Sequence, residues 1–543
     1  MEDLVSVLTD ASVIKATLCE FQKVCQKLAS VKSDASFIKA TLVSLKRRYL
    51  LGSCQILQTD CGYLAFNVKM NWVVVSQLVC FRSSKQVQEA NSSHNNPRTV
   101  LSWLIDNNMV SPREKVNYRS TRDSHPMKEG KITREGISCS YCKEVYTLSS
   151  SGHHAGSSNH IPYANIFLED GRSLLDCQVQ IMHGRRERNF WKQPCDRMKG
   201  NWHQGENDYI CTVCHIGGDL ILCDQCPSSF HKKCLGLKAV PEGDWFCSSC
   251  RCGICGHMNF KQEKESESIM DDCCVLTCGQ CEHKNHKGCL RKRGANENVS
   301  DPKGNWFCSK SCKKIFFSLD ELLGKQIPVG DDNLSWSLLK LNKCDTHATD
   351  EHDIDDALTD SRLNIALDVV HECFLPVKEP LTGRDLVEDV IFSRRSHLNR
   401  LNFQGFYTVL LERYDELITV ATVRIFGDKV AEVPLVATRF QYRRLGMCHL
   451  LMDELEKLLM ELGEERLVLP AVPSVLNTWT TSFWFSKMTP SERLKFLDYT
   501  FLDFEGTIMC QKLLMKNAPA EARPLEKVSV MLFSFFPLST QTK

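Results

Sequence analysis

Eight cysteine and histidine residues between positions 211 and 250 constrain the fold of this 543-residue chain more than any other feature. They form four pairs, each with two intervening residues: Cys211 and Cys214, Cys223 and Cys226, His231 and Cys234, Cys247 and Cys250. Such a gap allows neighbouring side chains to bind one tetrahedral zinc ion. Eight ligands make two zinc sites, and a segment of about 40 residues has too small a core to fold without them.

The composition favours metal binding over disulfide bonding. The chain has 29 cysteines, starts with acidic residues instead of a secretory signal, and contains no apolar stretch long enough to span a bilayer. These features predict a soluble protein with no membrane partner in a reducing compartment, where paired cysteines serve as metal ligands. The net charge of +1 excludes a global charge field that would attract nucleic acid.

A second cluster follows directly and predicts two more zinc sites. It differs from the first in a charged insert at 261–272 and in three residues between its last two ligands. Cys273 and Cys274 are spare thiols able to compete as ligands. The cluster is either a second reader or a structural module that rigidifies the first. Its predicted ligands are Cys252, Cys255, Cys278, Cys281, His286, Cys289, Cys308 and Cys312.

The first cluster resembles the PHD finger more than the RING finger, the zinc fold that would indicate ubiquitin transfer. Its single histidine is the fifth ligand, and Trp245 precedes Cys247 by two residues. The resemblance implies two interleaved zinc sites at 208–251 and a second, extended PHD-like finger at 252–316. Cys211, Cys214, His231 and Cys234 would bind one ion of the first finger, and Cys223, Cys226, Cys247 and Cys250 the other.

PHD fingers commonly bind the histone H3 tail as an added strand, here along the edge at 218–222. A methyl-lysine needs an aromatic cage, but residues 215–223 contain no Phe, Tyr or Trp. Asp219 and Asp224, with Glu206 and Asp208 nearby, offer carboxylates to unmodified ammonium and guanidinium groups. We therefore predict an unmodified tail as ligand; the alternative is a solvated acidic face. The predicted histone contacts are Asp219, Leu220, Ile221 and Asp224.

A mixed α/β domain is predicted over 361–515, after an acidic linker at 347–356. The glycine-containing turn at 443–448 opens a helix with an apolar stripe. Free backbone amides at such a turn, together with the helix dipole, suit a pyrophosphate. The predicted elements are strands at 406–411, 417–425 and 430–438, a helix at 449–462 and a strand at 467–470.

The turn resembles motif A of the GNAT acetyltransferases, (Gln/Arg)-x-x-Gly-x-(Gly/Ala), as Arg443-x-x-Gly446-x-Cys448. Cys448 departs from the last small residue of the motif. The resemblance implies that acetyl-CoA is the co-substrate and that the preceding strand pairs with its pantetheine arm. The implied binding residues are Val436, Ala437, Thr438, Arg443, Arg444, Leu445, Gly446, Met447 and Cys448.

Glu432 is the candidate general base. It precedes Arg443 by eleven residues, the spacing of the catalytic glutamate in GNAT histone acetyltransferases. A lysine amine has a pKa near 10.4 and must lose a proton before it can attack a thioester. The alternative for Glu432 is an exposed strand carboxylate without a catalytic role. Trp484 stands where the family usually has glycine, a bulky departure near the expected acyl site.

A further unit is predicted at 99–180, opened by Trp-Leu-Ile-Asp at 103–106. Its Cys139-x-x-Cys142 pair, with His154 and His160, is only a weak signal for a zinc site, and the favoured alternative is that the cysteines are small buried hydrophobes. Residues 1–95 contain a duplicated segment, at 10–18 and 34–42, that predicts two short helices, and 516–543 form a tail. No other function is predicted for either end.

The order of modules over 99–515 resembles the plant PHD-finger acyl-CoA N-acyltransferases of the increased-DNA-methylation type. This resemblance implies a nuclear histone acetyltransferase that modifies H3 tail lysines in chromatin regulation. It also implies that 99–180 is a Tify-binding (Jas-like) domain with a protein partner. The competing hypothesis is a chromatin adaptor that uses the PHD and GNAT folds for binding with little or no catalysis, which Cys448 and Trp484 favour.

Overall fold

The computed structural model describes most of the residues between 96 and 514. The predictions for 1–95, for the tail 516–543 and for the insert 261–272 lie outside the described residues. Within the described part, none of the helices has the length and apolar content needed to cross a bilayer. The described residues are 96–514 except 123, 157–160, 191–206, 259–273, 294–304, 331–332, 342–349, 380–381 and 505.

The first described domain is an antiparallel sheet with helices packed on it. Its strand order is β4-β3-β2-β1-β5. Thr99 caps the first helix, and the side chains of Leu101, Trp103 and Leu104 are buried in its core. The elements are α6 (Val100–Asp106), β1 (Lys115–Tyr118), β2 (Lys128–Ile132), β3 (Ile137–Cys139), β4 (Val145–Tyr146), α7 (Leu148–His154), α8 (Pro162–Asn165), β5 (Ile166–Leu168) and α9 (Leu174–Phe190).

The cysteine-rich region has little regular structure, as expected for a fold built around metal ligands. Each of its two parts contains one two-stranded antiparallel sheet, β6-β7 and β8-β9. The elements are β6 (Leu220–Leu222), β7 (Ser229–His231), η2 (Ser248–Cys250), β8 (Val275–Thr277), β9 (Lys284–His286) and α11 (Lys287–Lys292).

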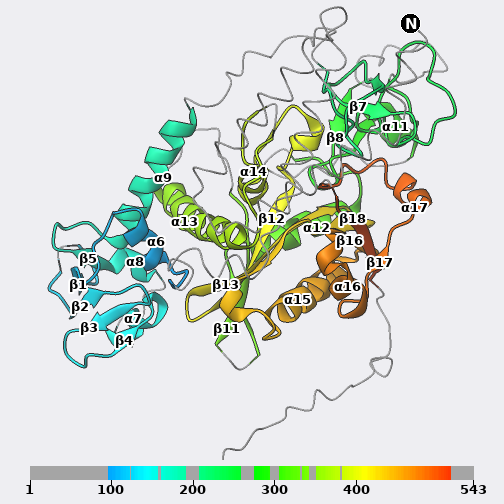
Figure 1. Ribbon diagram of the computed structural model, residues 1–543. Helices are drawn as coiled ribbons and strands as arrows, with labels where there is room; N and C mark the ends of the chain where they lie inside the picture. The colour runs from blue at the N-terminus through cyan, green and yellow to red at the C-terminus, as the bar shows by residue number, and fades with distance from the viewer. Residues whose placement is uncertain are drawn as a thin grey trace, which may run out of the picture. The chain divides into compact units, whose positions relative to one another are not determined.

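A large mixed sheet forms the C-terminal domain (Figure 1). Its order is β10-β11-β12-β13-β14-β16-β18-β17, and β15 pairs with β13 beside β14. The strands are β10 (Gln326–Val329), β11 (Leu334–Leu339), β12 (Phe406–Arg413), β13 (Glu416–Phe426), β14 (Val430–Glu432), β15 (Val436–Thr438), β16 (Arg466–Ala471), β17 (Ser486–Lys487) and β18 (Ile508–Leu513).

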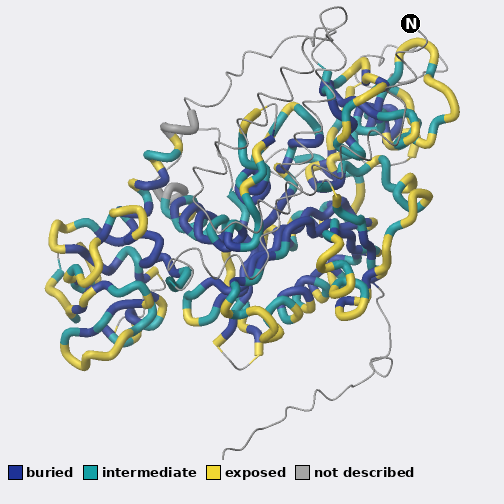
Figure 2. Tube along the Cα trace, viewed as in Figure 1, coloured by how far each residue is buried: buried dark blue, intermediate teal, exposed yellow. Residues whose placement is uncertain are grey.

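Alternating side chains of the central strands pack against helices on both faces of this sheet, and the strands are buried along most of their length (Figure 2). Phe406 and Leu410 lie in the core with α13 and α14, whereas Tyr407 and Val409 lie in the core with α12 and α15. The remaining elements are α12 (Lys310–Leu322), α13 (Asp350–Cys373), α14 (Leu386–Ile391), η3 (Asn399–Leu401), η4 (Phe440–Tyr442), α15 (Met447–Leu462), α16 (Pro473–Thr481) and α17 (Pro490–Leu494).

Several boundaries differ from the sequence-based prediction. The expected acidic linker at 347–356 is wrong in its second half, because α13 starts at Asp350 and covers the sheet. The sheet also begins at β10, earlier than the predicted domain start at 361. The expected continuous strand at 430–438 is two strands, because Pro434 lacks the N–H that a sheet ladder needs.

Glu464, directly after the helix cap Gly463, provides a test of this packing. It is 1% exposed, and neither carboxylate oxygen has a hydrogen-bond partner among the described residues. Burial, with repulsion from Asp428 and Glu465, raises the pKa of Glu464 from 4.5 to about 9. The native state therefore retains a proton that the unfolded state releases, so the free energy of unfolding falls as the pH rises from 4.5 toward about 9.

We expect Glu464→Gln to raise the Tm at about pH 8 and to change it little near pH 4.5, because the amide carries no charge to desolvate. The gain is at most about 1.4 kcal/mol per pH unit within this window. Calorimetry at both pH values measures it, with Glu461→Gln on the exposed face of α15 as the control. A gain independent of pH would contradict the assignment.

Candidate functional site

The structure brings together all sixteen predicted metal ligands in four groups of four. Within each group the ligand atoms lie within 4.8 Å of one another. Thiolate sulfur and imidazole nitrogen are the atoms that zinc prefers, and four of them suit a closed structural site. The groups are Cys211, Cys214, His231, Cys234; Cys223, Cys226, Cys247, Cys250; Cys252, Cys255, His286, Cys289; and Cys278, Cys281, Cys308, Cys312.

A recurring tight turn positions the ligand pairs, and we call it the cysteine turn. At Cys211, the backbone N–H donates to the carbonyl five residues later, Ile216, and the N–H of His215 donates back to Cys211. His215 has the left-handed φ of +57° that closes this turn. The same two bonds begin at Cys252, where Gly256 is left-handed, and at Cys278, where Glu282 is left-handed.

The first finger presents one strand edge for a peptide. Among the described residues, β7 is the only strand that pairs with β6. The other edge of β6 can therefore accept a peptide as an added strand. Asp219 is exposed beside this edge, Leu220 is half-buried and Ile221 is buried. The histone contacts predicted at these positions stay predictions.

Two of the acidic residues near this edge have structural partners. The Asp224 carboxylate accepts a 2.6 Å hydrogen bond from the Trp245 backbone N–H, so it caps the chain beside the second zinc site. Asp208 is 3% exposed and forms an ion pair with Arg400 of η3. The expectation that Asp208 offers a free carboxylate to a histone is therefore wrong, because a buried arginine neutralises it.

Arg400 joins the first finger to the C-terminal domain. Its guanidinium lies between Asp208 of the finger and Glu379, which is 2.9 Å away, and all three side chains are buried. Beside it, the Asn399 side-chain N–H donates a 3.0 Å hydrogen bond to the Ser228 hydroxyl. Two carboxylates around one arginine satisfy its fork of donors, so loss of the guanidinium would leave two buried carboxylates uncompensated.

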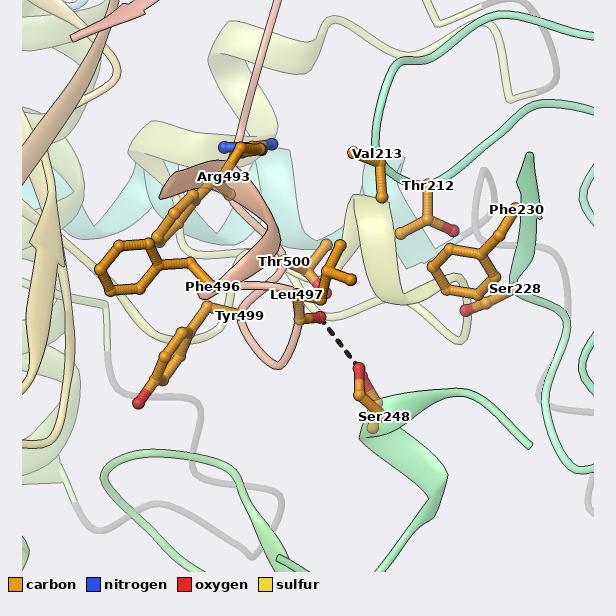
Figure 3. Close-up of a pocket in the computed structure, with 12 residues that line it drawn as sticks. Thr212, Val213, Ser228, Phe230, Ser248, Arg493, Phe496, Leu497, Tyr499 and Thr500 are labelled. Atoms are coloured by element: carbon orange, nitrogen blue, oxygen red, sulfur yellow. Dashed lines mark hydrogen bonds between the residues drawn. The ribbon is translucent and has the colours of Figure 1, made fainter. Parts of the chain in front are cut away.

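A small pocket lies where the first finger meets the segment between β17 and β18 (Figure 3). The Ser248 hydroxyl of the finger donates a 2.9 Å hydrogen bond to the Leu497 carbonyl of this segment. Phe230 lines the finger side and Arg493 and Phe496 line the other. This segment continues to Leu502, whose N–H bonds to Glu432.

The second finger is embedded in the C-terminal domain. The Gln280 amide donates a 2.9 Å hydrogen bond to the Ile425 carbonyl at the end of β13. The helix α12, which carries the ligand Cys312, buries Ile315 and Leu319 in the same core as α15. Among the described residues, the spare thiol Cys274 is exposed and outside every ligand group. These contacts favour the structural module over a second reader.

The strands β14 and β16 are parallel neighbours that separate at the candidate acyl-CoA site. Their pairing ends where the Val433 N–H donates to the Val468 carbonyl, and β15 continues beside β13 alone. The Leu435 carbonyl and the Arg439 N–H bond to β13, so by alternation Val436 and Thr438 direct their N–H groups to the opposite edge. Among the described residues, part of β15 therefore has no strand partner on that edge.

The turn from β15 into α15 has the conformation expected of an anion-binding loop. Arg444 and Gly446 have φ values of +62° and +80°, and both lie in the left-handed region. The first amides of α15 have no intrahelical acceptor. Burial raises the pKa of the Cys448 thiol to about 12, so it stays neutral and compact beside these amides. The side chain of Arg443 folds back instead, and its Nε donates to the Thr438 carbonyl at 3.0 Å.

Glu432 is the last residue of β14 and is 1% exposed, which excludes the exposed-carboxylate alternative. One carboxylate oxygen accepts a 2.6 Å hydrogen bond from Arg424 Nε, and the other accepts a 2.8 Å bond from the Leu502 N–H. Burial raises the pKa of Glu432, and the charge of Arg424 opposes that shift. The carboxylate is thus held by two partners at the point where β14 and β15 diverge.

Sequence reasoning missed Arg424. Its guanidinium lies 4.5 Å from the ring centroid of Phe406 and 4.6 Å from that of Phe426, and it also donates to the Thr500 carbonyl. The sequence did contain a signal for this residue. In the long apolar strand β13, Arg424 is the one charged residue apart from the first residue, Glu416. An arginine in a buried strand requires a carboxylate partner.

Trp484, which was predicted to lie near the acyl site, is not buried in the structure. It is 68% exposed, and its φ of +64° turns the indole outward between the buried side chains of Phe483 and Phe485. A left-handed φ is the conformation that glycine adopts most easily, which fits the glycine expected at this position. Tyr499 packs against Phe426 and Phe501.

Three segments match known sequence families, and together they define the class of protein. The matches are "Tify domain binding domain" at 130–181, "Histone-lysine N-methyltransferase NSD-like, PHD zinc finger 1" at 204–251, and "Increased DNA methylation 1, C-terminal domain" at 374–513. The chain is therefore a multidomain protein with zinc-finger modules, in which a domain of the Tify-binding type precedes a PHD-type finger.

The chain is similar to Increased DNA methylation 1 of Arabidopsis thaliana, at 36% identity over 80% of this chain. The aligned region spans 36% of that relative's length. The human Autoimmune regulator is 52% identical over 50 residues, which is 9% of each protein. Among solved structures, Tetrahymena GCN5 aligns at 14% identity with a TM-score of 0.22, over 30% of this chain and 91% of that chain.

Proposed function

We propose that this protein is a nuclear histone acetyltransferase of the GNAT class that transfers an acetyl group from acetyl-CoA to lysines of the histone H3 tail. The observation that supports it most directly is that the pairing of β14 with β16 ends before β15, which lies beside β13 alone ahead of the turn into α15. An extended amide chain fits the free edge of β15, and a diphosphate fits the amides at the start of α15. Coenzyme A has both parts in that order.

The binding residues that we propose are those of the strand and the turn. Backbone groups of Val436, Ala437 and Thr438 would accompany the pantetheine arm. The turn amides of Arg443, Arg444, Leu445, Gly446, Met447 and Cys448 would bind the diphosphate. The bound thioester supplies the activated acetyl group.

Glu432 is proposed as the residue that removes the proton from the lysine ammonium. Its raised pKa makes it a stronger base than an ordinary carboxylate. The amine must be neutral to attack, and the buried position of Glu432 keeps bulk water from competing for its proton. In the structure both oxygens are engaged, so the Arg424 pair must loosen, or a water molecule must relay the proton.

The first finger would read the unmodified H3 tail along β6, with Asp219 beside the peptide. The segment between β17 and β18 bonds to the finger through Leu497 and to Glu432 through Leu502. The first finger and Glu432 are thus joined through one segment of the chain. This connection supports the proposal that the protein acetylates the same histone tail that the first finger binds.

A chromatin adaptor with little catalysis is the second candidate. The observation that favours it is the closed Arg424–Glu432 ion pair, which leaves the carboxylate without a free oxygen. In that case the PHD finger and the acyl-CoA fold would serve binding alone, within the same chromatin setting.

The deciding experiment combines ligand binding with product detection. We expect acetyl-CoA to raise the Tm of the full-length protein by several degrees, since about 100 Kd of ligand contributes about 2.7 kcal/mol. Mass spectrometry of H3 tail peptides incubated with the protein and acetyl-CoA should then show added acetyl groups. A Tm shift without product would favour the adaptor. If there is no Tm shift and no product, both the acyl-CoA site and the acetyltransferase activity are excluded.

A further inference from the structure

Three potential metal ligands converge in the first domain, where the proposed function uses none of them. Cys139 is the last residue of β3, Cys142 follows in the turn to β4, and His154 ends α7. The His154 Nε2 atom lies 3.3 Å from Cys139 Sγ and 3.6 Å from Cys142 Sγ. Two thiols and an imidazole in mutual contact are the donor set of a zinc site.

The finger sites of the same chain provide an internal comparison. The Cys214 Sγ to His231 Nδ1 distance is 3.2 Å, and the Cys255 Sγ to His286 Nδ1 distance is 3.5 Å. Ligands bound to one tetrahedral zinc at about 2.3 Å for sulfur and 2.0 Å for nitrogen lie about 3.6 Å apart. The distances from His154 Nε2 to the two sulfur atoms are therefore close to those between ligands of one zinc ion.

The backbone gives independent support, because the cysteine turn of the fingers recurs at Cys139. The Cys139 N–H donates to the carbonyl five residues later, Glu144, and the Lys143 N–H donates back to the Cys139 carbonyl. Lys143 has a left-handed φ of +66°, like His215, Gly256 and Glu282 at the corresponding place in the fingers. Lysine adopts this conformation reluctantly, so metal binding by the flanking cysteines would account for the turn.

We propose that Cys139, Cys142 and His154 bind a fifth zinc ion. Tyr146 fixes the imidazole plane, because its ring stacks on His154 at 3.9 Å with an angle of 14°. Cys142 is exposed, so the fourth coordination position faces solvent and accepts water or a further side chain. The predicted partner His160 lies outside the described residues.

The ion would tie the turn between β3 and β4 to the C-terminal end of α7. At the other end of α7, the Ser149 N–H and hydroxyl donate to the Asp415 carboxylate at 2.8 Å and 2.6 Å. Asp415 lies in the tight turn between β12 and β13 of the C-terminal domain, with Tyr414 also left-handed there. The fifth zinc thus fixes the helix that contacts the acyltransferase sheet.

The number of zinc ions in the purified full-length protein tests this proposal. Four finger sites account for four ions per chain, and we expect five by elemental analysis. His154→Gln should lower the count by one, because the amide is a poor zinc ligand. His153→Gln is the matched control, since His153 is the exposed neighbour on the same helix and belongs to no ligand group. It should retain five.

A second variant separates metal loss from misfolding. Cys142→Ser changes one exposed atom and should also lose one zinc, while amide hydrogen exchange shows whether β1, β2 and β5 stay protected. In His154→Gln and Cys142→Ser we expect faster amide exchange in α7 and in the turn at Asp415. Exchange in the finger segments should not change. A wild-type count of four that neither variant changes would overturn the proposal, whatever the effect of the variants on folding.

Discussion

Glu432→Gln is expected to lower kcat/KM for acetyl transfer to an H3 tail peptide by about 10²–10⁴-fold, the range that a general base contributes. Glutamine retains an oxygen that can accept from Leu502 or Arg424, so the fold around β14 should persist. The amide cannot take a proton from the lysine ammonium. Binding of acetyl-CoA should be unchanged, because the proposed contacts to it come from backbone groups of β15 and of the turn before α15. Steady-state kinetics and an acetyl-CoA thermal shift on the same preparation measure both.

Glu412→Gln is the matched control for this variant. Glu412 is also a buried strand carboxylate, and it pairs with Arg362 at 2.6 Å in the same sheet. Glu412 lies near one end of β12, whereas Phe406, the residue opposite Arg424, lies at the other end. Glu412→Gln therefore tests the cost of breaking a buried ion pair away from the candidate site. If both variants lose activity equally, or if Glu432→Gln keeps nearly full activity, Glu432 is a structural residue and not the general base.

The wild-type pH profile adds a second readout. A base must be deprotonated to act, and the pKa of Glu432 is raised by burial. The rate should therefore rise with pH through this raised pKa, above the range of an ordinary glutamate. Loss of this limb in Glu432→Gln would assign it to the residue.

Cys223→Ser is expected to abolish binding of H3 tail peptides and to remove one zinc ion from the first finger. Cys223 is a buried ligand, and the Cys247 N–H donates to its sulfur at 3.2 Å. Structural zinc contributes on the order of 10 kcal/mol to such a small fold, far more than the core of the finger can replace. Zinc analysis and peptide titration by calorimetry measure the two effects.

Asp219→Asn separates loss of recognition from loss of folding. Asp219 is exposed and belongs to no ligand group, so the zinc count should not change. Removal of one charge-assisted hydrogen bond should weaken binding of the unmodified tail about tenfold or more. Unchanged affinity in Asp219→Asn would place the tail elsewhere on the finger, and unchanged affinity in Cys223→Ser would exclude this finger as the reader.

The parts of the site that the sequence predicts well are those governed by local spacing. The ligand pairs of the fingers meet because a gap of two or three residues lets neighbouring side chains bind one ion. The turn from β15 into α15 is similarly local, since Gly446 and the apolar stripe of the helix mark it directly. Pro434, which divides the expected long strand, was also visible in the sequence, but its effect on pairing depends on the neighbouring strand.

Contacts between distant segments could not be predicted in this way. Asp208 and Asp224 are acidic residues beside the peptide edge in the sequence, yet Arg400 neutralises one and the Trp245 amide engages the other. Their partners lie 192 and 21 residues away. The sequence contains each charge but not the distance between charges, and that distance decides whether a carboxylate is a binding group or a structural one.

The sequence by itself determined the metal-ligand pattern, the order of the modules and the glycine turn before α15, because ligand spacing, glycine and helical periodicity act over a few residues. The tertiary structure decided the state of Glu432, the embedding of the second finger and the convergence of His154 on Cys139 and Cys142. These features depend on burial and on partners brought together by the fold. Burial sets the electrostatic cost of a charge, and only packed neighbours can offset it.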